Sequence, residues 1–309
     1  MPHRLSHLAV LILTGLLAAC HATWLPVTGF TPPAEEPLGP TVALMSFNVR
    51  YGTARDGANS WDSRRDLVFE RIHAAAPDVV GVQEALAFQL DQLVAALPGY
   101  VAFGVGRDDG ARGGEFSAIL YDAARFERAN GGTFWLAPDP NAVGAVAWGA
   151  SLPRICTWVE LRERGTGAAL FVFNTHWDHQ SQESRARAGV LIRERMAALT
   201  GGERAVLMGD LNADEDNPAL VRLRGDDPTR PPLSGGDMQL VDTLRAVHGD
   251  GPLPGTYSGF EDGPPQRRID FVLTTPDLEI VDASVDLFRD RGRWPSDHCP
   301  VRATIALPD

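Results

Sequence analysis

The sequence predicts an α/β protein in which helices cover sheets of strands. Short apolar runs alternate with longer segments in which apolar residues recur at helical spacing. Several predicted strands also follow one another with no helix between them. Helices between some strands and direct strand-to-strand connections between others indicate an α/β sandwich.

The predicted strands are apolar runs bounded by turn-forming residues. In chain order they are Val42–Val49, Val79–Val82, Phe116–Tyr121, Ile155–Leu161, Ala169–Asn174, Ala205–Met208, Ile269–Thr274, Leu278–Val285 and Val301–Ile305. Helices are predicted over Asp62–Ala75, Leu86–Leu97 and Ser181–Leu199. Asp62 is expected to cap the first of them, and Pro77 ends it because proline cannot continue a helix.

The N-terminus has the pattern of an export signal. A short, mildly basic segment precedes the apolar run Leu8–Leu17, which is too short for a transmembrane helix of roughly 20 residues. The ending Leu17-Ala18-Ala19-Cys20 resembles a bacterial lipobox, which implies cleavage before Cys20 and acylation of that cysteine. An ordinary signal peptide cut near the same place is the alternative, and both predict export. His21, rather than aspartate, after Cys20 fits outer-membrane sorting in a host with such a membrane.

Three segments are therefore expected along the chain. Residues 1–20 form the signal peptide, and residues 21–40 form a proline-rich tether without a sustained apolar period. Residues 41–309 have a length within the range of one large α/β domain, and no internal repeat divides them. The domain is expected to be monomeric and to meet the membrane through the lipid anchor only.

The composition excludes some functions. The chain has 40 acidic and 28 basic residues, a formal net charge of −12, and no lysine. Without lysine, Schiff-base and P-loop mechanisms are excluded. The acidic balance argues against a large nucleic-acid footprint, which depends on clustered cationic contacts to phosphate. A nuclease stays open as an alternative because an active-site metal supplies local positive charge.

Cys156 and Cys299 are the two cysteines outside the export signal. An exported protein permits a disulfide between them, and the sequence does not decide whether they pair. The interpretation as two small buried hydrophobic residues is favoured.

Polar residues recur where predicted strands end, and loops at strand ends are where a rigid scaffold presents chemistry. These residues are Asn48, Glu84, His176, Asp210, Asn212, Asp297 and His298. Each of them alone has an ordinary structural explanation, such as a turn residue, a charge at a helix N-terminus or a buried imidazole. Their value as a signal lies in the complete set and its order.

In that order, six segments resemble the endonuclease/exonuclease/phosphatase superfamily of metal-dependent phosphoesterases. They are Met45-Ser46-Phe47-Asn48, Gly81-Val82-Gln83-Glu84, Asn174-Thr175-His176, Gly209-Asp210-Leu211-Asn212, Arg268-Ile269-Asp270 and Ser296-Asp297-His298. The resemblance covers nearly all of 41–305, which makes 41–309 the expected catalytic domain. It implies a four-layer α/β/β/α sandwich with two packed mixed sheets.

Phosphoester chemistry explains why these residue types are needed. An anionic phosphate repels hydroxide, so a cation must neutralise the transition state, and Mg²⁺ or Mn²⁺ prefers hard oxygen ligands. Glu84 is the first candidate ligand, and the resemblance adds Asn48 and Asp297. Zinc is a poor candidate because no Cys/His cluster has zinc spacing.

The remaining members of the set are expected to act on water and phosphate. Asp210 would orient or deprotonate the attacking water, and Asn212 would donate to a phosphoryl oxygen. The alternative for this pair is an Asx-type turn after a strand. His298 would contact the phosphoryl group with Asp270 holding its tautomer, and His176 would contact phosphate or help the leaving oxygen.

Four further residues are weaker candidates for substrate binding. Arg154 has a guanidinium suited to phosphate, but a surface salt bridge explains it equally well. Tyr121 is a site residue by position or a packed strand tyrosine, and Asp178 and His179 are expected to adjust specificity. The leading functional prediction is an exported hydrolase of small phosphoesters. An extracellular endo- or exonuclease and a non-catalytic binding module are the alternatives.

Overall fold

The computed structural model describes residues 40–226 and 238–308. They lie within one compact unit, Leu38–Asp309. The predicted signal peptide with Cys20, and nearly all of the predicted tether, lie outside the described residues. Within the described part of the chain, none of the helices combines the length and the apolar character needed to cross a membrane.

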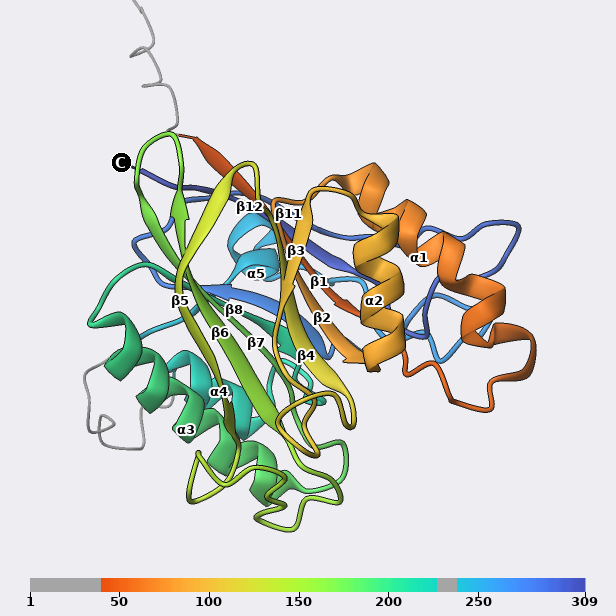
Figure 1. The fold of residues 1–309 in the computed structure, drawn as a ribbon, viewed down its shortest axis with the longest axis horizontal. Coiled ribbons are helices and arrows are strands. Elements are labelled where there is room, and N and C mark those ends of the chain that lie inside the picture. Colours follow the sequence, from red (N-terminus) through yellow and green to blue (C-terminus); the bar gives the residue numbers. More distant parts are fainter. Residues whose placement is uncertain (1–39, 227–237, 309) are drawn as a thin grey trace, which may run out of the picture. The chain divides into compact units, whose positions relative to one another are not determined.

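Two mixed sheets of six strands form the middle of the fold (Figure 1). The first has the order β11-β12-β1-β2-β4-β3 and consists of β1 (Thr41–Asn48), β2 (Val79–Ala85), β3 (Tyr100–Phe103), β4 (Phe116–Asp122), β11 (Ile280–Val285) and β12 (Val301–Ala306). The second has the order β5-β6-β7-β8-β10-β9 and consists of β5 (Phe126–Trp135), β6 (Ile155–Glu163), β7 (Ala169–His176), β8 (Ala205–Asp210), β9 (Val241–Asp242) and β10 (Asp270–Thr274).

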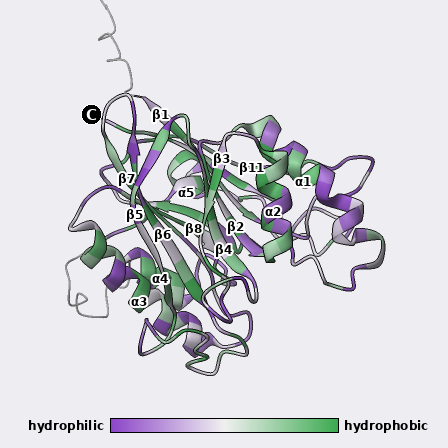
Figure 2. Ribbon diagram, viewed as in Figure 1, coloured by the Kyte–Doolittle hydropathy of each residue, from purple (hydrophilic) through white to green (hydrophobic). Residues whose placement is uncertain are grey.

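Helices cover the outer face of each sheet. The structure has α1 (Trp61–Ala75), α2 (Ala87–Ala96), α3 (Gln182–Thr200), α4 (Pro218–Arg224), α5 (Thr243–His248) and a short 3-10 helix, η1 (Gly57–Asn59). Figure 1 shows α1 and α2 beside the first sheet, and α3 and α4 beside the second. In Figure 2, α1 and α3 each carry hydrophobic and hydrophilic segments, as helices with one packed face and one solvated face do.

Three hydrophobic clusters separate the layers. Phe47 of β1 packs with Val68 of α1 outside the first sheet, and Phe173 of β7 packs with Ile192 of α3 outside the second. Leu44 of β1 belongs to the third cluster, between the sheets. Neighbouring strand residues thus bury opposite faces, which explains the unbroken apolar runs in the sequence. The predicted four-layer α/β/β/α sandwich is confirmed.

Several elements differ from the sequence expectation. The first helix begins at Trp61 with Ser60 at its N-cap, so Asp62 stands in the first turn, where its charge favours the positive helix end. β3 and β5 were not expected, and the middle of β5 is exposed and polar. Leu278 precedes β11 instead of beginning it. Short, polar or half-exposed strands carry little periodic signal, so tertiary pairing decides them.

The two cysteines of the described residues, Cys156 and Cys299, are both buried and unpaired. Burial raises the pKa of each thiol, that of Cys299 to about 12. They are therefore inert core residues, and the interpretation as small hydrophobic residues is confirmed.

A buried asparagine ties the two sheets together. Asn174 lies on β7, yet its amide nitrogen donates to the carbonyls of Val82 (2.9 Å) and Ala118 (2.8 Å) in the first sheet. Its amide oxygen accepts from Gln83 Nε2 at 2.7 Å. Gly81 makes room for this contact, because a Cβ there would lie 3.0 Å from the Asn174 side chain. Motif residues beside the site thus fix the distance between the sheets.

We expect Asn174→Ala to lower the free energy of unfolding by about 3 kcal/mol, because it leaves buried carbonyls and an amide without partners. Urea denaturation measures the change. Asn141→Ala, at an exposed loop position, is the matched control and should stay within about 0.5 kcal/mol of the unaltered protein. Equal stability of the two variants would contradict the role of Asn174 as an inter-sheet tie.

Candidate active site

The sheet topology brings the predicted site residues to one end of the sandwich. β1 and β2 are parallel, as are β7 and β8, so the last residues of each pair lie at the same end of their sheet. β12 is antiparallel to β1, and β10 is antiparallel to β8. The segments that enter β12 and β10 therefore reach the same end. A pocket of about 630 Å³ opens there, and Glu84, His176, Asp210, Asn212, Asp297 and His298 line it.

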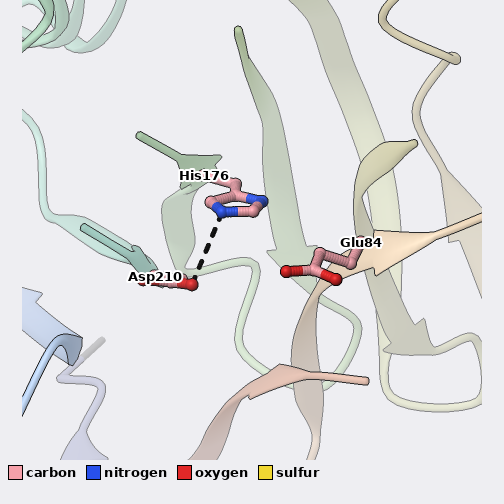
Figure 3. A group of neighbouring side chains, drawn as sticks. All are labelled: Glu84, His176 and Asp210. Carbon is pink, nitrogen blue, oxygen red and sulfur yellow. Dashed lines mark ion pairs between the residues drawn. The ribbon is translucent and has the colours of Figure 1, made fainter. Parts of the chain in front are cut away.

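One buried asparagine joins the two sheets at the floor of the pocket. Asn48 Nδ2 donates to Glu84 Oε1 and to Asp210 Oδ2, both at 3.0 Å. Glu84 comes from the first sheet and Asp210 from the second. Figure 3 shows the carboxylates of Glu84 and Asp210 on either side of a gap that His176 also faces. The amide of Asn48 thus holds two acidic side chains toward one point.

Glu84 is presented by an irregular strand end. The pairing of β2 with β4 shifts between Gln83 and Ala85, and Glu84 has a φ of 62°, in the left-handed region. Such strain costs on the order of 1–3 kcal/mol and is concentrated at functional sites. Its Oε2 accepts from the backbone nitrogen of Tyr51 at 3.1 Å. The bulge turns the carboxylate into the pocket instead of along the sheet.

The segment 209–212 needs its glycine and forms an Asx-type turn. A Cβ at Gly209 would lie 2.1 Å from the carbonyl oxygen of Thr175, so only glycine allows β8 to approach β7 this closely. Asp210 Oδ1 accepts from the backbone nitrogen of Asn212 at 2.9 Å. Asn212 Nδ2 donates to the carbonyl of Trp177 at 3.0 Å, which leaves its other N–H for the pocket. The turn is therefore the device that positions both side chains.

The two imidazoles of the site differ in charge. His298 Nδ1 lies 2.9 Å from Asp270 Oδ2, and His298 Nε2 lies 3.7 Å from Asp210 Oδ2. Burial disfavours its charge, but Asp270 and Asp210 outweigh burial and hold the pKa of His298 well above its usual value. Burial, reinforced by Arg154, holds the pKa of His176 well below the usual value. These shifts favour the protonated imidazolium of His298 and the neutral imidazole of His176.

Asp210 lies close to three other site residues, Asn48, His176 and His298. Its Oδ2 lies 3.5 Å from His176 Nε2 (Figure 3). The same oxygen accepts the hydrogen bond from Asn48 Nδ2. Burial raises its pKa to about 7, although the charge of His298 opposes this. Burial likewise raises the pKa of Asp297. A cation beside these buried carboxyl groups would favour their ionised forms.

Among the described residues, two groups have ligand atoms within 4.8 Å of one another. One is Glu84, His176 and Asp210, and the other is Asp210, Asp270 and His298. Asp270 already holds the charged His298, so the first group is the better fit for a metal. Its carboxylate oxygens with one neutral imidazole suit a divalent cation. Glu84 fits its predicted place at the metal, and Asp210 and His176 lie beside it.

Asn48 and Asp297, the other predicted ligands, have partners in the protein. Asn48 Oδ1 accepts from the backbone nitrogen of Arg50 at 3.0 Å. Asp297 Oδ1 accepts from Ser296 Oγ at 3.2 Å, and its Oδ2 lies 3.6 Å from Arg50 Nε. Asp297 stands outside both groups of candidate ligands among the described residues. The ligand role of these two residues stays a prediction.

The weaker candidates separate into two sets. Arg154 and His179 line the pocket, with Arg154 Nη2 3.0 Å from His179 Nδ1. Asp178 is buried behind them, where its Oδ1 accepts from the backbone nitrogens of Gln180 and Ser181. Tyr121 belongs to the hydrophobic cluster between the sheets and does not line the pocket, because its position on β4 faces inward. The structure therefore places Tyr121 in the core and not in the site.

Further pocket residues were not singled out by the sequence analysis. They include Arg50, Tyr51, Arg107, Glu115, Tyr257 and Arg267. Arg50 and Tyr51 directly follow the strand that ends at Asn48, so continuing past that strand end would have included them. Tyr257 packs edge-on against His298, with 5.0 Å between ring centroids, from a loop that has no periodic pattern. Only the folded structure shows that Tyr257 lies at the pocket.

Comparisons with known proteins agree with this geometry. The model of the Endonuclease/Exonuclease/phosphatase family matches residues 45–298. An endonuclease/exonuclease/phosphatase from Bacteroides vulgatus is 30% identical, with a TM-score of 0.78 over 87% of this chain and 100% of that one. A mannosyl-6-phosphatase from Bacteroides thetaiotaomicron is 31% identical, with a TM-score of 0.76 over 85% of this chain and 99% of that one. The human Nocturnin catalytic domain shares the fold at 17% identity, with a TM-score of 0.69 over 88% of this chain and 96% of that one.

The chain belongs to the Endonuclease/Exonuclease/phosphatase family, and the suspected resemblance is confirmed. Proteins of this family are divalent-metal-dependent hydrolases of phosphoester bonds, and the chain is an enzyme of that class. The acidic and imidazole side chains at the pocket are suitable ligands for such a metal.

Proposed function

We propose that the protein is an exported, Mg²⁺- or Mn²⁺-dependent hydrolase of small phosphoesters. The observation that carries the proposal is the convergence of Glu84, Asp210 and His298 at one pocket from distant parts of the chain. The metal would be held by Glu84, with Asn48 and Asp297 as the further ligands that the resemblance implies, and when bound it supplies positive charge to the transferring phosphoryl group. The volume of about 630 Å³ is within the range of small-ligand pockets.

Different residues of the pocket have different roles in hydrolysis. Asp210 Oδ2 orients the attacking water and takes its proton. The imidazolium of His298, fixed by Asp270, donates to a phosphoryl oxygen, and the free N–H of Asn212 donates to another. His176, neutral and 3.5 Å from Asp210, contacts the phosphate on the opposite side or assists the leaving oxygen.

Two observations favour small substrates over nucleic acid. The net charge of −12 argues against an extended cationic surface for a polyanion. The similar Bacteroides thetaiotaomicron protein is a mannosyl-6-phosphatase, which makes sugar phosphates the first substrates to test. An extracellular nuclease is the alternative within the same chemistry.

A substrate screen tests the proposal. The purified protein is stripped of metal, and Mg²⁺ or Mn²⁺ is restored in the presence of bis-nitrophenyl phosphate, nitrophenyl phosphate, sugar phosphates, inositol phosphates, sphingomyelin or plasmid DNA. We expect metal-dependent turnover of a small phosphoester. Turnover of DNA alone would support the nuclease, and hydrolysis of none of them with either metal would contradict the proposal.

Export through a lipid anchor is the other part of the proposal, and it rests on the sequence around Cys20. We expect the protein to fractionate with membranes and the Cys20→Ser variant to be released from them. Mass spectrometry of the mature N-terminus is the direct measurement. A Cys20→Ser protein that still fractionates with membranes, together with an unmodified N-terminus in the original chain, would exclude the lipid anchor.

A further inference from the structure

The side of the pocket next to His176 contains two buried arginines whose hydrogen bonds differ. Arg107 gives both terminal nitrogens to Glu115, with Nη1 2.7 Å from Oε2 and Nη2 2.8 Å from Oε1. Arg154 is only 3% exposed and lines the same pocket. Its Nη2 meets His179, but its Nε and Nη1 have no hydrogen-bond partner. Arg154 therefore keeps two buried, unused donors beside the pocket.

Nearby acidic groups do not use these donors. Asp178 is the nearest carboxylate, 3.5 Å from Arg154 Nε, but its Oδ1 accepts from two backbone nitrogens and its Oδ2 faces Ser151. Glu115 is bonded to Arg107 through both oxygens. A buried guanidinium without full hydrogen bonding is costly, and it can only donate. An anionic ligand in the pocket can supply the acceptors that these donors need.

Arg154 lies beside the part of the pocket where the reacting phosphate is expected to bind. Arg154 and Arg107 line the same pocket as His176, Asp210 and His298. His176 in turn lies 3.5 Å from Asp210. The unused donors of Arg154 thus border the part of the pocket where the phosphoryl group must lie for Asp210 and His298 to act on it.

We propose that Arg154 binds the additional charged oxygen of a terminal phosphate and makes the enzyme selective for phosphomonoesters over phosphodiesters. This inference rests on the proposed function. A monoester carries a charge of about −1.5 to −2 at neutral pH, whereas in a diester one of these oxygens is esterified and carries no charge. The planar guanidinium matches two oxygens of one phosphate, and His179 with Asp178 holds it in place.

Nitrophenyl phosphate and bis-nitrophenyl phosphate test the selectivity, because they differ in that oxygen and contain no sugar hydroxyl. We expect Arg154→Gln to lower kcat/KM for the monoester by about 10- to 100-fold, the range for loss of hydrogen bonds to a charged group. Its kcat/KM for the diester should change by less than about 3-fold. Arg164→Gln, at a half-exposed position at the opposite end of β6 from Arg154, is the matched control and should change neither.

Binding of inorganic phosphate, followed by calorimetry with the metal present, gives a readout independent of turnover. We expect Arg154→Gln to weaken it by about 10-fold or more. Arg154→Lys keeps the positive charge but loses the planar pair of donors, so its phosphate affinity should lie between those of the unaltered protein and Arg154→Gln. It replaces Arg154→Gln in the test if that variant does not fold. Equal losses on both esters, an effect only on sugar phosphates, or unchanged phosphate binding would overturn the inference. Absence of hydrolysis by the unaltered protein, with phosphate binding still dependent on Arg154, would instead count against the proposed function.

Discussion

Asp210→Asn lowers kcat by at least about 100-fold while the fold survives, because the amide cannot take the proton of the attacking water. The carboxylate is buried, and its Oδ2 faces Asn48, His176 and His298 at 3.0 to 3.7 Å. The substitution keeps the size of the side chain, and its amide oxygen can still accept from the backbone nitrogen of Asn212. Steady-state kinetics with saturating metal measures the effect.

Asp216→Asn is the matched control for this experiment. Asp216 follows the same strand by six residues but is exposed, so its kcat should remain within about 2-fold of the unaltered value, as is usual for surface substitutions. Thermal denaturation of both variants checks folding. A folded Asp210→Asn protein with near-normal turnover would remove Asp210 from the catalytic step.

Glu84→Gln raises the Mg²⁺ or Mn²⁺ concentration needed for half-maximal activity by at least about 100-fold, since outer contacts to a metal site alone change affinity by about 10- to 100-fold. Glu84 lies in the group of candidate ligands with His176 and Asp210. Glutamine preserves an oxygen for the hydrogen bond from Tyr51 but removes the charge. Titration of each metal into stripped protein measures the shift.

Glu127→Gln provides the comparison, because Glu127 is an exposed residue of β5 that pairs only with the half-exposed Arg164. Its metal dependence should match that of the unaltered protein. If Glu84→Gln were saturated at the same metal concentration as this control, Glu84 would not be a ligand.

Much of the fold was predictable because buried strands have a strong signal. β1, β2, β7 and β8 are apolar on both faces, and each predicted run lies within the observed strand or within one residue of its end. β5 was missed because its exposed middle contains Glu127, Arg128 and two glycines, which give neither alternation nor an apolar run. Pairing with β6 over its whole length makes it a strand.

The site was predictable to the extent that its residues stand at strand ends. Asn48, Glu84, His176 and Asp210 each occupy the last or next-to-last position of a strand. Parallel pairing brings Asn48 to Glu84 and His176 to Asp210, and the packing of the two sheets brings these two pairs together. The environment of Arg154 was not predictable, because its burial and its contact with His179 depend on how the loops fold. Tyr121 shows the reverse case, in which the position along a strand did not reveal the side that it faces.

The central claim is that the acidic and imidazole groups of distant loops surround one cation beside a phosphate. Crystals of the protein grown with Mn²⁺ and inorganic phosphate test it through the anomalous signal of manganese. We expect a manganese peak within about 2.0–2.6 Å of a Glu84 carboxylate oxygen, the range for hard cations bound to oxygen, with phosphate between it and His298. A manganese peak elsewhere, with this pocket empty at saturating Mn²⁺, would contradict it.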